Sequence, residues 1–182
     1  MGGGPVKQLG ELGEFGLIRD LARRLEREPA APTVGKVCLG IGDDAAILEL
    51  PPEHRLVVTA DALIEDVHFR RDWSSARELG WKALAVNVSD LGAMGARPVG
   101  AVVTLGLPRG TDAGWVRELY AGLGECAKAY GCPIVGGDTV RAPTEVALSV
   151  TALGAVPAGR AVTRAGARPG DLVCVTGVLG ES

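Results

Sequence analysis

The chain opens with apolar residues at helical spacing and continues with apolar runs at strand spacing. The first pattern predicts a helix over residues 13–27, with an apolar face formed by Phe15, Leu17, Ile18, Leu21 and Leu25. Short β-rich runs at 37–41, 45–50 and 56–60 predict three strands, and the last of these is expected to end at Asp61.

Two longer amphipathic segments follow, separated by a Val-rich strand over 98–107. Ser74 or Ser75 caps a helix that reaches about residue 92, and its buried face is predicted to carry Trp81, Leu84, Ala85 and Val88. Thr111 or Asp112 caps the next helix, which is expected to end at Gly131.

The remaining pattern predicts three more strands. Ile134 and Val135 form a short strand that enters a Gly-Gly-Asp loop, and strong alternation marks a strand over 145–156. After a turn at 168–171, residues 172–176 read as a last strand. This order of elements predicts an α+β fold, a mixed β-sheet with helices packed on one face.

Composition narrows the class of protein. The 182 residues are 47% hydrophobic and only 4% aromatic, which is enough for one domain with an aliphatic core. The net charge is −3 and no basic stripe with interleaved aromatics occurs, so a nucleic-acid partner is not expected. No apolar run approaches the roughly 20 residues that span a bilayer, so a membrane is not expected either. The four cysteines form no CxxC, which favours reduced thiols in a cytoplasmic protein over a zinc site.

Aspartates beside small residues occur at four places, and three of these follow a predicted strand. The motifs are Gly42-Asp43-Asp44, Thr59-Ala60-Asp61, Asn87-Val88-Ser89-Asp90 and Gly136-Gly137-Asp138. Strand ends of one sheet are often neighbours, and converging carboxylates repel one another unless a cation joins them. Ligands that are all oxygens suit Mg²⁺, and glycines let the backbone approach a phosphate. Taken singly, each loop motif is explained as well by a turn or a helix cap as by a function, whereas the set together favours a function.

Three further residues have a structural and a functional interpretation. His68, beside Phe69, is either a packed or surface residue or a site residue. Arg164 reads by itself as a surface cation, and Tyr120 as core packing or a base-stacking residue. Asp90 lies on an otherwise apolar helix, where a buried lone acid would be costly, and this favours a function.

The ordered set of motifs resembles the thiamine-monophosphate kinase family. The resemblance lies in the four acidic motifs, in Val67-His68-Phe69, in Ala93-Met94-Gly95-Ala96 and in Gly159–Arg164, and it covers nearly all of residues 11–182. It implies an N-terminal ATP-binding domain of the aminoimidazole ribonucleotide synthetase-like type that pairs with a second copy as a homodimer. Residues 1–10 would be a flexible leader, 11–176 the metal- and ATP-binding domain, and 177–182 the start of a linker to a C-terminal domain.

The resemblance also implies roles for individual residues. Several Mg²⁺ ions would be held by Asp44, Asp61, Asp90 and Asp138, with help from Thr59 and Ala60 and with Asp43 as an additional candidate. ATP would contact Tyr120, Gly137, Asp138 and Arg164, and the substrate would contact His68. The expected reaction is direct in-line transfer from ATP to thiamine monophosphate, driven by positioning and metal electrostatics without a catalytic side chain. The alternatives are another ATP-dependent enzyme of the same superfamily and a non-catalytic, dimerising nucleotide-binding module.

Overall fold

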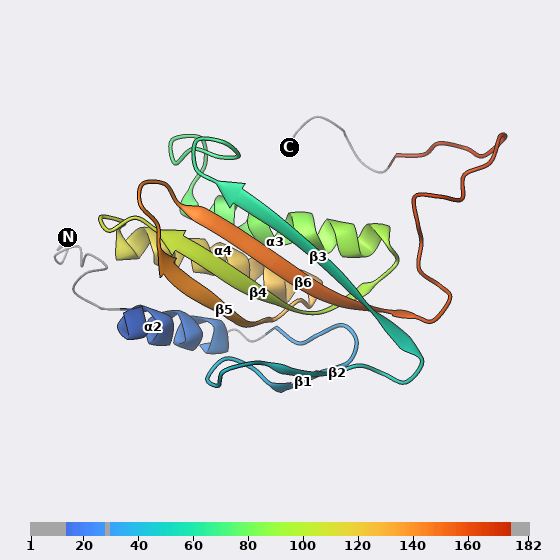
Figure 1. Cartoon of the computed structure of the whole chain (residues 1–182), viewed down its shortest axis with the longest axis horizontal. Helices are drawn as coiled ribbons and strands as arrows, with labels where there is room; N and C mark the ends of the chain where they lie inside the picture. The colour runs from blue at the N-terminus through green and yellow to red at the C-terminus, as the bar shows by residue number, and fades with distance from the viewer. Residues whose placement is uncertain (1–13, 28–29, 176–182) are drawn as a thin grey trace.

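A single mixed sheet organises the described part of the molecule (Figure 1). The computed structural model describes residues 14–27 and 30–175. Its sheet has the order β3-β6-β4-β5, built from β3 (His54–Ile64), β4 (Arg97–Leu107), β5 (Ile134–Arg141) and β6 (Ala147–Pro157). The central pairs β3–β6 and β6–β4 are antiparallel, and β5 pairs with β4 in parallel. A separate small hairpin consists of β1 (Lys36–Leu39) and β2 (Ile47–Glu49).

Two helices cover one face of this sheet and leave the other face open (Figure 1). They are α3 (Ala76–Ala93) and α4 (Ala113–Tyr130), and α2 (Glu14–Arg27) adds Leu17 and Leu21 to the same core. Alternate residues of the central strands, such as Val103 of β4 and Val150 of β6, are buried beneath the helices. The expected α+β fold with helices on one face is therefore confirmed. None of the helices in the described ranges is long and apolar enough to cross a bilayer.

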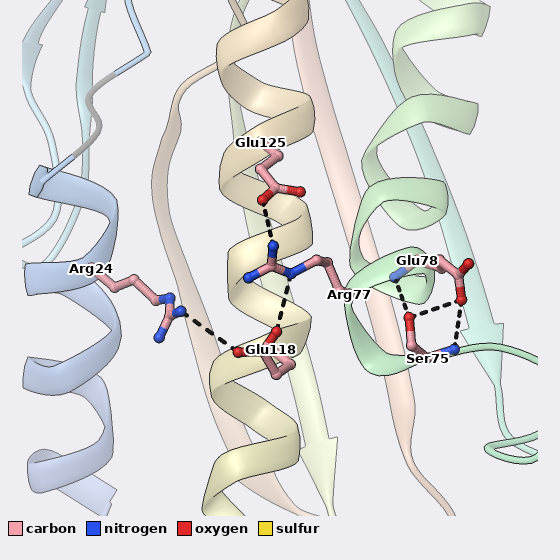
Figure 2. A network of polar contacts seen from close by, with 6 residues as sticks. All are labelled: Arg24, Ser75, Arg77, Glu78, Glu118 and Glu125. Carbon is pink, nitrogen blue, oxygen red and sulfur yellow. Dashed lines mark hydrogen bonds and ion pairs between the residues drawn. The ribbon is translucent and has the colours of Figure 1, made fainter.

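The helix ends follow the local signals in the sequence. Ser75 caps α3 through a capping box, in which its hydroxyl accepts from the backbone N–H of Glu78 and its own N–H donates to the Glu78 carboxylate (Figure 2). Asp112 caps α4, and Gly131 ends that helix in the left-handed conformation at φ 61°. These ends lie where the sequence predicts them, because capping depends on neighbouring residues alone.

Helices α3 and α4 touch backbone to backbone at two glycines. A Cβ atom added to Gly80 would lie 1.9 Å from the Leu119 carbonyl oxygen, and one added to Gly122 would lie 1.8 Å from the Arg77 carbonyl oxygen. Only glycine at both positions allows this approach. The contact fixes the relative placement of the two helices on the sheet.

Ion pairs between charged side chains connect α2, α3 and α4 outside the hydrophobic core (Figure 2). Arg77 of α3 lies between Glu118 and Glu125 of α4 and donates to both at 3.0 Å. Glu118 also pairs with Arg24 of α2 at 3.7 Å, so the three helices share one ion-pair network. Its members are between about one third and one half exposed, and they contribute to orientation more than to stability.

Three predictions about the elements are wrong. Asp61 and Asp138 lie inside β3 and β5 rather than in loops at strand ends, because pairing with β6 and β4 extends each strand past the aspartate. Trp81 is 37% exposed and stacks edge-on against Tyr130 rather than facing the core. Residues 172–175 form no strand, and Leu172 and Val173 are 89% and 98% exposed. The predicted leader (1–10) and linker (177–182) lie outside the described residues, as do residues 11–13 and 176 at the borders of the predicted domain.

Candidate metal and nucleotide site

One group of candidate residues gathers where β3 runs beside α3. The Thr59 hydroxyl donates a hydrogen bond to Asp90 Oδ2 at 2.9 Å, although the two residues are 31 positions apart. Asp61 lies two residues beyond Thr59 on the same face of the strand, about 6.6 Å further along it. Both carboxylates are exposed to solvent. Thr59, Asp61 and Asp90, termed the β3-edge group below, therefore present a hydroxyl and two carboxylates at one place.

A second group lines a cleft of about 690 Å³ beside β5. Asp43 and Asp44 reach this β5 cleft from the segment after β1, and Gly136, Gly137 and Asp138 reach it from the strand itself. Apolar side chains of α2, including Ile18 and Leu21, form much of the remaining lining. The cleft thus combines an apolar wall with three carboxylates and a glycine-rich backbone.

Gly137 brings the backbone of β5 unusually close to its neighbour. Its φ is 151°, and a Cβ atom there would lie 1.9 Å from the Val103 carbonyl oxygen. Every other residue type is excluded at this position. The glycine therefore allows β5 to lie close against β4 directly before Asp138, and both Gly137 and Asp138 line the cleft.

The two groups lie at opposite edges of the sheet. β3 and β5 are the outer strands of the four, so about 14 Å separates them at a strand spacing of about 4.8 Å. The register also aligns Asp61 with Val150, Val103 and Gly137, which places Asp138 on the opposite face, beside Thr104. One copy of the chain does not bring Asp44, Asp61, Asp90 and Asp138 together. Within the described ranges, no three acidic, His or Cys side chains are close enough to hold a metal ion.

The β3-edge group nevertheless has the donors that Mg²⁺ takes in phosphate-transfer sites. Mg²⁺ there is bound through one or two carboxylates plus substrate phosphates, rather than by a cage made of protein alone. Asp61 and Asp90 supply the carboxylates and Thr59 an added oxygen, with no sulfur or imidazole among them. The residues present fit a magnesium ion that is shared with a bound phosphate.

His68 lies in a compact loop that follows β3. Its Nδ1 accepts a hydrogen bond from the Ile64 backbone N–H at 3.1 Å, which places the ring hydrogen of the neutral imidazole on Nε2. Phe69, only 4% exposed, anchors the loop in the core, while the His68 ring stays exposed. The loop therefore presents an N–H donor to solvent.

A half-buried carboxylate holds the base of the same loop. Glu65 pairs with the Arg71 guanidinium, whose Nε lies 2.6 Å from Oε1, and its Oε2 accepts hydrogen bonds from Arg71 Nη2 and from the Val146 backbone N–H, both at 2.9 Å. Burial raises the pKa of Glu65, but these hydrogen bonds outweigh it and leave the pKa below its ordinary value of 4.5. Arg71 also lies over the Trp115 ring, 5.1 Å from its centroid.

The other site residues predicted from the sequence do not form a further group. Tyr120 is 7% exposed and belongs to the core; its ring borders the β5 cleft and its hydroxyl bonds to Thr139. Burial raises the pKa of Tyr120 to about 12. Ala60 points to the open face, away from Thr59, and Arg164 lies in an exposed segment that is not part of the cleft lining. Asp90 is exposed, so the cost of a buried acid does not apply to it.

The sequence reasoning missed one polar residue near the site. Asn87 is completely buried on α3, one turn before Asp90. The available signal was a polar amide within the apolar stripe of an amphipathic helix.

This fold and these residues define the class of protein. Residues 42–156 match the family model of the AIR synthase related protein, N-terminal domain, and the chain belongs to this family. The chain is 42% identical over 176 residues to the thiamine-monophosphate kinase of Synechococcus elongatus, covering 97% of the chain and 50% of that protein.

Comparison with solved structures also finds proteins similar to this chain. AaThiL complexed with AMPPCP and TMP is 36% identical, with a TM-score of 0.61 over 89% of the chain and 47% of that protein. The hydrogenase maturation protein HypE in complex with ATP is 26% identical, with a TM-score of 0.69 over 90% of the chain and 48% of that protein. The resemblance to thiamine-monophosphate kinases is thereby confirmed. The chain spans about half the length of the curated relatives that it matches.

Proposed function

We propose that the chain is the metal- and nucleotide-binding half of a thiamine-monophosphate kinase. The observation that carries this proposal is the similarity, over 89% of the chain, to an enzyme complexed with both AMPPCP and TMP. Among the solved structures, the identity to HypE is 26% against 36% for AaThiL, which favours the kinase over another ATP-dependent member of the superfamily.

The reaction is transfer of the γ-phosphoryl group of ATP to a phosphate oxygen of thiamine monophosphate. The bond between the γ-phosphorus and the β–γ bridging oxygen breaks, a new bond to the acceptor oxygen forms, and ADP leaves. The acceptor is already an anion at neutral pH, so this step requires no strong general base. Bound Mg²⁺ would supply neutralisation of the charge that two approaching phosphates carry.

The described residues supply binding and orientation. Asp43, Asp44 and Asp138, with the glycines of β5, would receive the triphosphate of ATP and its metal at the β5 cleft. The β3-edge group would hold magnesium at the other edge of the sheet, and His68 would donate Nε2–H to the phosphate of the acceptor. Tyr120, buried in the core, lines one wall of the cleft. Arg164 would contact ATP only after its exposed segment has moved toward the cleft.

We further propose that two copies pair through the open face of the sheet. Leu56, Val58 and Ile64 of β3 are 51%, 55% and 40% exposed there, and Val140 of β5 is 46% exposed. Pairing buries this apolar face and allows β5 of one copy to lie beside β3 of the other. Such an arrangement would place Asp138, on the open face of one copy, beside β3 of the other copy, whose opposite face carries Thr59 and Asp61.

The test is a phosphoryl-transfer assay on the complete protein with ATP, Mg²⁺ and thiamine monophosphate. Formation of thiamine diphosphate and ADP in equal amounts is expected, with no transfer to unphosphorylated thiamine. Asp90→Asn is expected to lower turnover by at least about 100-fold, whereas Glu125→Gln, a carboxylate of the helix surface, leaves it unchanged. ATP consumption that does not depend on thiamine monophosphate would contradict the proposal.

A further inference from the structure

Helix α3 carries a buried polar atom that has no partner. Asn87 is 0% exposed, and its Nδ2 donates to the Ala83 carbonyl oxygen at 3.0 Å. Within the described ranges, Asn87 Oδ1 is the one buried side-chain polar atom without a hydrogen-bond partner. The identity of the two amide atoms is fixed, because a carbonyl oxygen can only accept and the atom facing Ala83 must be the nitrogen.

An unpaired buried acceptor is unfavourable, because it has lost its hydrogen bonds to water and gained none in the protein. Leucine would fill a similar volume on the apolar stripe of α3, where Leu84 and Leu91 are both fully buried. Packing in the core therefore does not explain why an asparagine occupies this position. A ligand that contacts the amide oxygen would explain it.

Asn87 lies next to the candidate metal site. Asn87 and Asp90 are three residues apart on α3, so their side chains are neighbours on the helix surface. Asp90 is bonded to Thr59 of β3, and Leu91 packs toward Gly154 of the adjoining strand β6. Asn87 thus lies on the buried side of the β3-edge group, in the layer between α3 and the strands. With its nitrogen turned back to Ala83, its oxygen is directed away from that carbonyl.

We propose that Asn87 Oδ1 is the inner oxygen contact of a divalent cation held by Asp61 and Asp90, reached directly or through one water molecule of the hydrated ion. This inference rests on the proposed metal-binding function of the β3-edge group. A neutral amide oxygen adds a ligand dipole without adding charge, so it strengthens binding without increasing the repulsion between the two carboxylates. Asn87 is a positioning residue for the metal rather than a catalytic one.

The first experiment compares wild-type protein with Asn87→Leu by calorimetric titration with Mn²⁺ alone and by thermal unfolding with and without Mn²⁺. Asn87→Leu is expected to unfold at the same or a higher temperature without metal, because the unpaired oxygen is gone. Its affinity for Mn²⁺ is expected to fall about 10- to 100-fold, and the metal-induced rise in Tm to shrink accordingly. Leu123→Val, a conservative core change on α4, is the control and should lower Tm while leaving Mn²⁺ affinity intact.

The second variant, Asn87→Asp, keeps the inference testable if the leucine variant does not fold. A buried carboxylate beside Asp90 should lower Tm without metal and give a larger metal-induced rise than wild type. Equal loss of Tm with and without Mn²⁺ would overturn the inference, as would unchanged Mn²⁺ affinity in Asn87→Leu.

The outcomes also separate the two proposals. If wild-type protein binds Mn²⁺ and Asp90→Asn abolishes binding while Asn87→Leu does not, the proposed function stands and the role of Asn87 falls. If wild-type protein binds no Mn²⁺, either alone or together with the ATP analogue AMPPCP, both fall together.

Discussion

The hydroxyl of Thr59 on β3 donates to the carboxylate of Asp90 on α3 at 2.9 Å, and this bond connects the sheet to the helix at the candidate metal site. Removing the hydroxyl leaves Asp90 free to rotate. We expect Thr59→Val to weaken Mn²⁺ binding about 10-fold, as loss of an orienting partner does in other metal sites. Thr59→Ser retains the hydroxyl and should bind like wild type in the same calorimetric titration. Equal affinity for all three proteins would rule out an orienting role for Thr59.

The glycine contact between α3 and α4 predicts opposite effects for two alanine substitutions on one helix. Alanine generally stabilises a helix by about 1 kcal/mol over glycine. At Gly80, however, the new methyl group meets the Leu119 carbonyl at 1.9 Å, and such overpacking costs about 1–3 kcal/mol or more. Gly80→Ala should therefore lower the free energy of unfolding in urea. Gly92→Ala, whose Cβ meets nothing within 4 Å, should raise it.

Glu65 predicts a pH dependence of stability. Its pKa is lower in the folded protein than the ordinary 4.5, so its contribution is fully present above that value and is lost as the pH falls through the folded-state pKa. Glu65→Gln should lower stability at neutral pH by roughly 1.5–3 kcal/mol, the usual value of charged hydrogen bonds, and should flatten the acid limb. Unfolding in urea between neutral pH and pH values below 4.5 measures this. Asp72→Asn, 67% exposed in the same loop, should leave the profile as in wild type.

Tyr120 predicts a second pH window, in alkali. Since burial raises the pKa of Tyr120 from 10.0 to about 12, its contribution is present below pH 10 and is lost as the pH rises toward 12. Tyr120→Phe keeps the ring and removes the bond to Thr139, so we expect about 1 kcal/mol of lost stability at neutral pH and no such alkaline window. Spectrophotometric titration of the two proteins measures the difference. An early ionisation of Tyr120 would show that the ring is exposed in solution.

The exposed apolar residues on the open face of the sheet predict that the protein forms a dimer. Val58→Lys places a charge among Leu56, Ile64 and their neighbours and should convert a dimer into monomers in analytical ultracentrifugation. Trp73→Lys changes an even more exposed apolar residue, 69% accessible, on the loop after β3 and should leave the dimer intact. A wild-type protein that stays monomeric at high concentration would remove the basis for a site shared between two copies.

Local signals in the sequence were reliable guides to local structure. The caps at Ser75 and Asp112 and the left-handed Gly131 were predictable, because each is determined by the few residues around it. The α+β arrangement was predictable as well, since the periods of the apolar pattern separate helices from strands.

Pairing over long distances was not predictable. Nothing in the sequence near Asp61 or Asp138 shows that pairing with β6 and β4 extends the strands past them, so the local pattern predicts loops there. Helical periodicity predicts a buried face for α3, but it does not show that Trp81 lies at the edge of that face, 37% exposed and packed against Tyr130. The strand expected at 172–175 has no partner strand in the described ranges.

The close approach of α3 and α4 at Gly80 and Gly122 also restricts how the molecule can move. Asp90 and Tyr120 are carried by two helices that cannot slide past each other, because backbone meets backbone at the crossing. The two helices are therefore expected to move as one rigid unit beneath the sheet. We therefore expect closure around a ligand to involve the segment that carries Asp43 and Asp44 and the loop that carries His68 rather than these two helices.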